Sequence, residues 1–249
     1  MKVRFGVDVI DEHEIPSTVA VFTENVGGCA REFAITAMRL SSQNENVKSY
    51  YFSVTDAVEE VKDKISLTFP KENPESVLEN VEIVSFAEAY FEKSAIPMRW
   101  IGGKEMLESM RERRGIMVEI INAFDNIEEN SFIFFDSLTD LVRLVGFEIK
   151  WRDLIDFIKG LKKVCKRKES IVAFHYSKLP NERENELLDQ FDIVVDFELS
   201  YERGEMRRWM YIRKFSGLMP FIERSGISRF EVKLDPFVGA VISRVHRVI

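Results

Sequence analysis

Apolar runs and segments of helical periodicity alternate along the chain. Runs rich in β-branched and aromatic residues predict buried strands at 17–23, 47–54, 81–86, 131–137 and 171–177. Apolar residues that recur every three or four positions predict helices from Ala30 onward and at 56–65, 103–125, 151–168 and 182–191. Asp56 is expected to cap the second of these helices. Such alternation is typical of a mainly parallel sheet covered by helices on both faces.

The last part of this pattern is different. Two further strands, 192–199 and 207–215, follow each other with only a tight turn between them. A connection that short joins antiparallel strands, so we expect an antiparallel edge from 192 to 215. The chain has no internal repeat, no low-complexity tract and no clear linker, and we therefore interpret 1–249 as a single α/β domain.

Composition narrows the function classes. The 249 residues are 45% hydrophobic and carry a net charge of −7, which argues against broad nucleic-acid binding by bulk electrostatics. Cys29 and Cys165 are far apart, so a disulfide framework is excluded and a reducing compartment is expected. No run approaches the ~20 apolar residues of a membrane span, and the first residues lack the apolar core of a signal peptide. We therefore expect a cytoplasmic protein without membrane contact.

Several local strings, in order, resemble one family. An apolar strand ends in FFDSLTDL at 134–141, and FDIVVDFEL at 191–199 precedes MRRWMYIRKFSG at 206–217. PFIERSGI at 220–227 follows, and IPSTVAVFTENVGG lies at 15–28, where a strand leads to two glycines and a helix. These segments are similar to those of the KaiC-type group of RecA-like ATPase domains, which is abundant in archaea. The resemblance covers nearly the whole chain.

The resemblance implies a RecA-like three-layer sandwich of the P-loop NTPase type, with a mainly parallel twisted sheet and an antiparallel edge. It also implies a phosphate-binding loop, in which glycines let backbone N–H groups converge on the phosphates. A lysine of that loop neutralises the β and γ phosphates, and a Ser or Thr hydroxyl holds Mg²⁺. Members of the group form rings through this domain, so self-association is compatible with the resemblance.

Placed in register with that loop, the sequence departs from the pattern. Glu24 stands at the first glycine, Gly27 keeps a central glycine, and Cys29 replaces the glycine before the lysine. Ala30 replaces the lysine, and Arg31 replaces the hydroxyl residue. An inward carboxylate would oppose phosphate, because like charges about 4 Å apart cost several kcal/mol at an effective dielectric near 20.

Other positions of the family pattern point the same way. Ser53 and Val54 occupy the place of the glutamates that activate the attacking water. Lys214 is retained on the late strand, but Ser216 replaces the arginine that reaches a neighbouring subunit's nucleotide. Asp136, the acid on the magnesium side, remains. We therefore do not expect conventional ATP hydrolysis, and we do not expect an enzyme.

Each singled-out residue also has a purely structural interpretation. Gly27 and Gly28 form an ordinary strand-to-helix turn in one interpretation and a phosphate cradle in the other. Asp136 and Ser137 either end a strand and cap the next segment or retain a metal. His175 is interpreted as a satisfied core or strand-end histidine.

The remaining candidates follow the same scheme. Cys29 is interpreted as buried and inert rather than activated at a helix N-terminus. The basic run 162–168 is interpreted as the solvated end of its helix. Segment 94–106 holds Met98, Trp100 and Ile101 in a Pro/Gly context, and it folds onto the core, packs as a lid over the vestigial nucleotide site, or docks a partner.

The function hypothesis is a catalytically inactive RecA/KaiC-like homologue that binds a protein partner as a regulator or scaffold in a signalling-type assembly. Its vestigial nucleotide site comprises Glu24, Gly27, Gly28, Arg31, Asp136, Ser137 and Lys214. No cofactor and no metal are expected, apart from weak binding of ATP with Mg²⁺. The alternatives are a nucleotide sensor that does not hydrolyse its ligand and, less favoured because of the net acidity, a nucleic-acid accessory protein.

Overall fold

The computed structural model describes residues 3–44, 46–73, 76–77, 80–101, 115–202 and 204–246, without the side chains of 228, 245 and 246. One sheet of nine strands, in the order β3-β2-β4-β5-β1-β6-β7-β8-β9, runs through it. The strands are β1 (Val19–Glu24), β2 (Lys48–Ser53), β3 (Val81–Ser85), β4 (Ser131–Asp136), β5 (Ile171–Ser177), β6 (Ile193–Glu202), β7 (Glu205–Phe215), β8 (Ile227–Asp235) and β9 (Gly239–His246).

The first six strands of that order, from β3 to β6, are parallel, and the last four, from β6 to β9, are antiparallel. The predicted antiparallel edge is therefore confirmed. It extends two strands further than the predicted boundary at 215, because β8 and β9 continue the meander.

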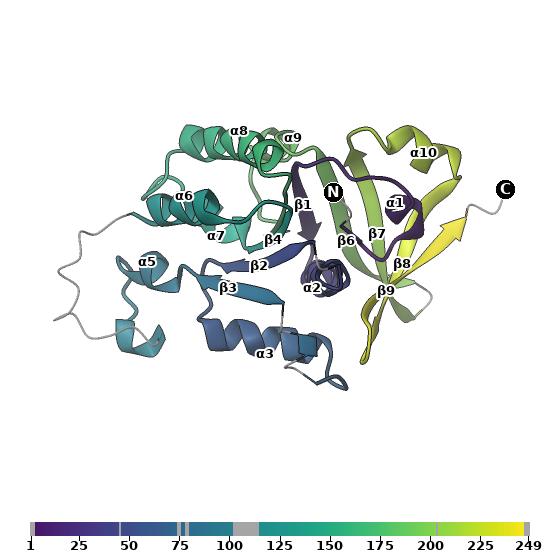
Figure 1. The fold of residues 1–249 in the computed structure, drawn as a ribbon, viewed down its shortest axis with the longest axis horizontal. Helices are drawn as coiled ribbons and strands as arrows, with labels where there is room; N and C mark the ends of the chain where they lie inside the picture. Colours follow the sequence, from purple (N-terminus) through teal and green to yellow (C-terminus); the bar gives the residue numbers. More distant parts are fainter. Residues whose placement is uncertain are drawn as a thin grey trace.

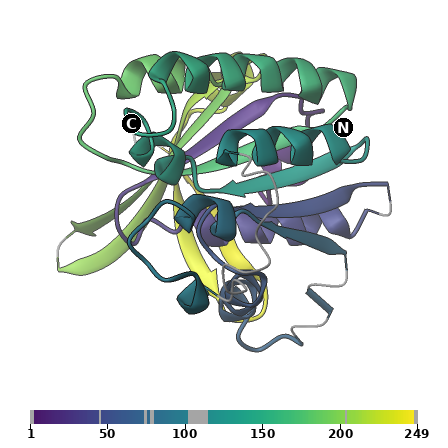
Figure 2. The same cartoon turned by 90° about the vertical axis from the view of Figure 1, so that its left-hand side faces the viewer.

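Helices cover both faces of the sheet (Figures 1 and 2). The longer ones are α2 (Ala30–Ser42), α3 (Val58–Thr68), α6 (Ile116–Asn126) and α8 (Trp151–Arg167). The shorter ones are α1 (Asp8–Asp11), α5 (Ala87–Phe91), η1 (Met98–Ile101), α7 (Leu138–Arg143), α9 (Glu184–Asp189) and α10 (Met219–Arg224). The segment 102–114, part of the helix predicted at 103–125, lies outside the described residues. None of the described helices is long and apolar enough to cross a membrane.

Side chains at alternate positions of each strand enter one of two cores. One core packs β-strand residues such as Phe22, Phe134 and Ala173 against α2 and α3. The other packs residues such as Phe135 and Phe174 against α6, α7 and α8. Because side chains alternate between the two faces of the sheet, the position of the last residue in each parallel strand determines which face its side chain lies on.

The N-cap residue of helix α3 lies one position later than the sequence pattern predicts. Ala57 is its N-cap residue, and Glu60 accepts a hydrogen bond from the Ala57 N–H at 2.8 Å. Asp56 does not cap the helix, so that prediction is wrong. Its carboxylate pairs instead with Lys64 and lies 3.3 Å from the hydroxyl of Ser53. The carboxylate of Asp56 therefore pairs with the ammonium of Lys64, two turns along α3, instead of accepting a hydrogen bond from the first turn of the helix.

The antiparallel strands bend back against α2, so that this helix contacts β9 as well as β4, β1 and β2. Buried Thr36 accepts a hydrogen bond from the N–H of Ala240 at 2.9 Å and donates to the carbonyl of Glu32 at 2.7 Å. A Cβ at Gly239 would lie 2.3 Å from the Thr36 hydroxyl, so only glycine allows this approach.

This contact gives a stability prediction. Thr36→Val keeps the side-chain shape but leaves the buried N–H of Ala240 without an acceptor, which should lower the free energy of unfolding by about 1–3 kcal/mol. Urea denaturation measures the effect. Thr68→Val is the matched control, because the Thr68 hydroxyl also donates to the carbonyl four residues earlier but, in the described part of the chain, accepts no hydrogen bond from a strand. Equal losses in the two variants would contradict the role of Thr36.

Candidate functional site

The carboxyl ends of the parallel strands bring four polar side chains together on the α2 face of the sheet. Strand β5 lies between β1 and β4, and β2 lies on the other side of β4. The alternation that buries Phe22, Phe134 and Ala173 on the α2 face places Glu24, Asp136 and His175 there too. Tyr51 joins them from β2. All four side chains are buried beneath the first turn of α2.

The carboxylate of Glu24 lies at the N-terminus of α2. Its Oε2 accepts a hydrogen bond from the Ala30 N–H at 2.9 Å, and its Oε1 lies 2.6 Å from His175 Nε2. Burial opposes ionisation of Glu24, but His175 and the Ala30 N–H outweigh it and lower the pKa of this carboxyl. A helix N-terminus favours an anion. Here the anion at the N-terminus of α2 is the carboxylate of Glu24.

The carboxylate of Asp136 is the centre of the cluster. Arg31 donates to both of its oxygens, at 2.8 and 3.0 Å, and the hydroxyl of Tyr51 donates at 2.6 Å. His175 Nδ1 lies 3.1 Å from Oδ1, at an angle that makes an ion pair rather than a hydrogen bond. Lys64 lies 4.0 Å away. These contacts outweigh complete burial and hold the pKa of Asp136 well below its ordinary value.

His175 is sandwiched between the two carboxylates. Burial disfavours its protonated form, but Asp136 and Glu24 on either side of the ring raise its pKa above the ordinary value. With His175 protonated, the two acids are balanced by the imidazolium and by the guanidinium of Arg31. The cluster is then neutral, which removes most of the cost of burying unpaired charge.

The loop from Asn25 to Cys29 is fastened to β6 and β7. The Asn25 side chain accepts from the Leu199 N–H at 2.8 Å, the Asn25 N–H donates to Phe197 O at 3.3 Å, and Arg208 donates to Gly27 O at 3.0 Å. The Gly28 N–H turns back to Asn25 O at 2.9 Å. The N–H groups of Asn25, Gly28 and Ala30 are therefore all bonded within the chain.

The two glycines of this loop are required by packing. A Cβ at Gly28 would lie 2.7 Å from the carbonyl oxygen of Phe197, and Gly27 has a φ of +86°. Cys29 follows, also with a positive φ of 71°. Its side chain is buried, and burial raises the pKa of the thiol to about 12. Cys29 is thus held as a thiol at neutral pH, as the inert interpretation requires.

Ser137 and Lys214 have other partners. The hydroxyl of Ser137 accepts from the Asp140 N–H and caps α7, as the structural interpretation predicts. Lys214 pairs with Val194 at the start of β6, the end of the strand away from the loop, and donates to Asp189 O at 2.9 Å. The structure brings Glu24, Arg31 and Asp136 together with the glycine loop and leaves Lys214 outside.

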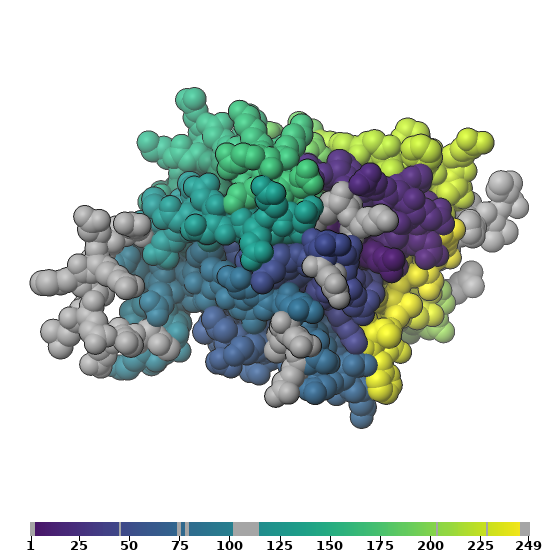
Figure 3. All heavy atoms as spheres, viewed as in Figure 1, coloured from purple at the N-terminus to yellow at the C-terminus, as the bar shows by residue number. Residues whose placement is uncertain are grey.

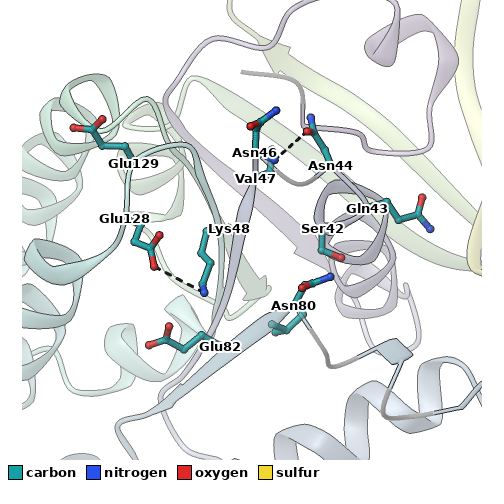
Figure 4. Close-up of a pocket in the computed structure, with 11 residues that line it drawn as sticks. Ser42, Gln43, Asn44, Asn46, Val47, Lys48, Asn80, Glu82, Glu128 and Glu129 are labelled. Carbon is teal, nitrogen blue, oxygen red and sulfur yellow. Dashed lines mark hydrogen bonds and ion pairs between the residues drawn. The ribbon is translucent and has the colours of Figure 1, made fainter.

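The surface has two hollows that bear on the site, one beside the charge cluster and one at the opposite end of the parallel strands. A pocket of about 410 Å³ between α2, α3 and the β8–β9 turn has Arg31, Lys64, Leu67 and Leu234 in its lining. A wider hollow of about 710 Å³ lies at the opposite edge, where β2 and β3 begin, and Lys48 approaches Glu128 in it at 3.8 Å (Figure 4). The smaller pocket has Arg31 in common with the charge cluster, so it is the one that adjoins the site.

Segment 94–106 is described only as far as residue 101. Met98–Ile101 form the short helix η1, in which the side chain of Trp100 is 73% exposed, while Met98 and Ile101 are half-buried. The core-packing interpretation therefore does not hold for Trp100. Among the described residues, no group of three or more His, Cys, Asp or Glu side chains is arranged to hold a metal ion.

The fold matches solved structures over nearly their whole length. A KaiC-like protein from the hyperthermophilic archaeon Pyrococcus horikoshii OT3 is 14% identical with a TM-score of 0.65, covering 97% of this chain and 98% of that one. The flagellar accessory protein FlaH from Methanocaldococcus jannaschii is 13% identical with a TM-score of 0.66, covering 98% and 99%.

A third structure, an uncharacterized protein from Pyrococcus horikoshii in complex with an unknown peptide, is 12% identical with a TM-score of 0.64, covering 95% of each chain. No protein-family model and no curated protein matches the sequence. The fold is therefore the RecA-like α/β fold of KaiC-like proteins and FlaH, as the resemblance implies.

The charge cluster predicts a two-sided dependence of stability on pH. The lowered pKa values of Glu24 and Asp136 give a contribution that is complete above about pH 4.5 and lost as the pH falls. The raised pKa of His175 gives one that is complete below about pH 6.5 and lost as the pH rises through its folded value. His175→Gln should remove the alkaline loss and keep the acidic one, as measured by urea midpoints across pH. An unchanged alkaline limb would show that His175 is not its source.

Arg31 gives a second prediction. Arg31→Met leaves the buried carboxylate of Asp136 without its bidentate partner and should lower the free energy of unfolding by about 3 kcal/mol. The control is Arg152→Met, which breaks an exposed pair with Asp156 on α8 and should cost less than about 1 kcal/mol. Thermal or urea unfolding of both variants measures the difference. Similar small losses would mean that Asp136 does not depend on Arg31.

Proposed function

We propose that this chain is a RecA-like protein that does not hydrolyse ATP and acts by binding a protein partner, as a regulator or scaffold. The observation that carries the proposal is the position of Glu24. Its carboxylate lies where a phosphate would meet the N-terminus of α2, and it is bonded to the Ala30 N–H and to His175. A triphosphate entering this position would have to displace a paired, buried carboxylate.

The state of Asp136 supports the same proposal. A magnesium-side acid must offer its oxygens to the ion or to the water around it. Both oxygens of Asp136 are bonded to Arg31, and one also accepts from Tyr51. Arg31 stands where the loop hydroxyl would be, so the hydroxyl ligand for magnesium is absent. The same Arg31 side chain also occupies the carboxylate of Asp136, the acid on the magnesium side.

Partner binding is supported by surface side chains beside the occupied loop. Val26 is 97% exposed in the loop itself. Tyr201 and Met206 face each other across the β6–β7 hairpin, at 76% and 52% exposure. This hairpin projects beyond the helices (Figure 2). One structural neighbour is described as a flagellar accessory protein, and another is in complex with an unknown peptide.

A second candidate is a sensor that binds a nucleotide without hydrolysing it. The pocket of about 410 Å³ favours it, because Arg31 and Lys64 line one side of a space large enough for a small ligand. In this candidate the ligand lies beside the occupied loop rather than within it. It shares with the leading proposal the absence of phosphate transfer.

Phosphate release and calorimetry with Mg-ATP test the proposal. The wild-type chain should release no phosphate above the blank, because no lysine and no magnesium ligand are available at the loop. A triple variant, Glu24→Gly with Ala30→Lys and Arg31→Thr, restores the first glycine, the lysine and the hydroxyl of the loop and should gain heat of binding for Mg-ATP. Thermal unfolding of the variant checks that it is folded.

The outcomes separate the candidates. Heat of binding for ATP or ADP in the wild-type chain, without turnover, would replace the scaffold proposal by the sensor. Turnover by the wild-type chain would overturn both. Neither heat nor turnover in the wild type, with heat in the triple variant, is the result that the proposal requires.

A further inference from the structure

The pocket of about 410 Å³ beside the charge cluster lies between α3 and the β8–β9 turn, with α2 beneath it. Its volume is within the range of about 300–1,000 Å³ that is typical of small-molecule sites. The end of α3 and the β8–β9 turn lie side by side in Figures 1 and 3, and the Lys71 N–H donates to Pro236 O at 3.1 Å between them. The side chains of the lining indicate which class of ligand fits this space.

The cations of the lining lie on the side of α3. Arg31 bonds the carboxylate of Asp136, and the ammonium of Lys64 on α3 lies 4.0 Å from the same carboxylate. Arg31 uses Nε and Nη2 for Asp136, and its Nη1 has no hydrogen bond among the described residues. Lys64 has three donors, of which the pair with Asp56 uses one. Both cations therefore keep donors for a ligand.

The acids of the lining lie on the opposite side, toward the β8–β9 turn. Glu32 precedes Thr36 by one helical turn, on the face of α2 that holds the start of β9. Asp235 ends β8, and its Oδ1 accepts from the N–H groups of Phe237 and Val238. In the part of the chain that the structure describes, neither Asp235 Oδ2 nor the carboxylate of Glu32 has a hydrogen-bond partner. Both acids therefore keep acceptors for a ligand.

Apolar side chains line the space between the two charged sides. Leu67 on α3 and Leu234 on β8 are 76% and 45% exposed. Ile35, Pro70 and Pro236 complete this part of the lining. A ligand that covers the two leucines removes apolar surface from water, which favours binding. The lining therefore fits an apolar body with a negative group at one end and a positive group at the other.

The two sides of the pocket are joined at one end. Arg39 donates to Phe237 O in the β8–β9 turn at 2.7 Å, and it pairs with Glu72, which follows α3, at 3.3 Å. The bond from Lys71 to Pro236 lies beside these contacts. Together they close the pocket at that end, which limits the length of an occupant.

We propose that this pocket binds a short apolar peptide with free termini. The carboxylate of the peptide accepts from Arg31 and Lys64. Its ammonium donates to Glu32 and Asp235, and its side chains cover the two leucines. In a single amino acid both charged groups are attached to one carbon, whereas the pocket holds its cations and its acids on opposite sides. A peptide, whose termini are further apart, therefore fits better than a single amino acid.

The charge of the lining favours a zwitterion over a nucleotide. The charged side chains that line the pocket, Arg31, Lys64, Glu32 and Asp235, sum to zero. A triphosphate would bring several negative charges next to the two acids, which costs affinity. The peptide therefore competes with the nucleotide of the sensor candidate for one pocket. The inference does not rest on partner binding at the β6–β7 hairpin.

Calorimetry with trileucine tests the proposal. The wild-type chain should bind trileucine, while N-acetyl-trileucine and trileucine amide should each bind at least about tenfold more weakly, because each lacks one charged terminus. Free leucine should also bind at least about tenfold more weakly. No heat with trileucine at millimolar concentration, or equal affinities for trileucine and its blocked forms, would overturn the proposal.

Two variants identify the pocket as the place of binding. Leu67→Ser should weaken trileucine binding about tenfold, because it removes exposed apolar surface from the lining. Glu32→Gln should weaken trileucine binding about tenfold and leave the affinity for N-acetyl-trileucine unchanged, since that analogue has no ammonium. Thermal unfolding of each variant checks that it is folded.

The matched controls lie outside the lining. Val118→Ser on α6 and Glu88→Gln on α5 change exposed residues of the same kinds. Both should keep the wild-type affinity for trileucine. Equal losses in the controls and in the pocket variants, or no loss in the pocket variants, would show that trileucine binds elsewhere and would overturn the assignment. Phosphate release and calorimetry with Mg-ATP test the proposed function separately, so the two can fail independently.

Discussion

A buried carboxylate has to be neutralised, and the site of this protein is organised around that constraint. Asp136 ends the interior strand β4 with almost no exposure, so its charge can persist only beside cations and donors. Arg31 from α2, His175 from β5 and Tyr51 from β2 provide them. Each of these residues comes from a different element, and the cluster therefore also fixes how α2 sits on the sheet.

Glu24 extends the same logic to the helix N-terminus. The acids at the ends of β1 and β4 would repel each other across β5, which lies between these strands. The protonated ring of His175 on β5 is attracted to both carboxylates and so offsets the repulsion. The first turn of α2 contributes the Ala30 N–H as a further donor. With His175 protonated, the cluster contains two acids and two cations, and each charge is paired within it. No unpaired cation is therefore left in the cluster to attract an incoming polyanion.

The sequence predicted much of the fold because its periodicities are strong. Fully apolar strands such as 131–136 and an amphipathic α8 are determined locally, and the strand-end positions of Glu24 and Asp136 follow from them. His175 was interpreted as a satisfied strand-end residue, which is correct for its burial. Its role between two acids depends on β5 lying between β1 and β4, and no local pattern reports that order. Tyr51 was missed for the same reason.

The other failures are of different kinds. Strands β8 and β9 were not predicted as strands, although charged and apolar residues alternate along β8 from Arg229 to Asp235 with the period of a half-buried strand, so a signal present in the sequence was missed. Asp56 was assigned to a cap from its position alone, and the reach of Lys64 decided otherwise. The loop's bonds to Phe197, Leu199 and Arg208 join segments more than 170 positions apart, a distance at which sequence spacing carries no geometric information.

Helix α2 has a second engagement that changes what a rigid element means here. Its first turn holds Glu24 and Asp136, and Thr36, six positions along and therefore about 9 Å up the axis, holds the start of β9. The helix thus connects two distant parts of one sheet, since its first turn contacts the ends of β1 and β4 and its middle contacts the start of β9. The outermost strand and the buried charges are therefore joined through less than two turns of a single helix.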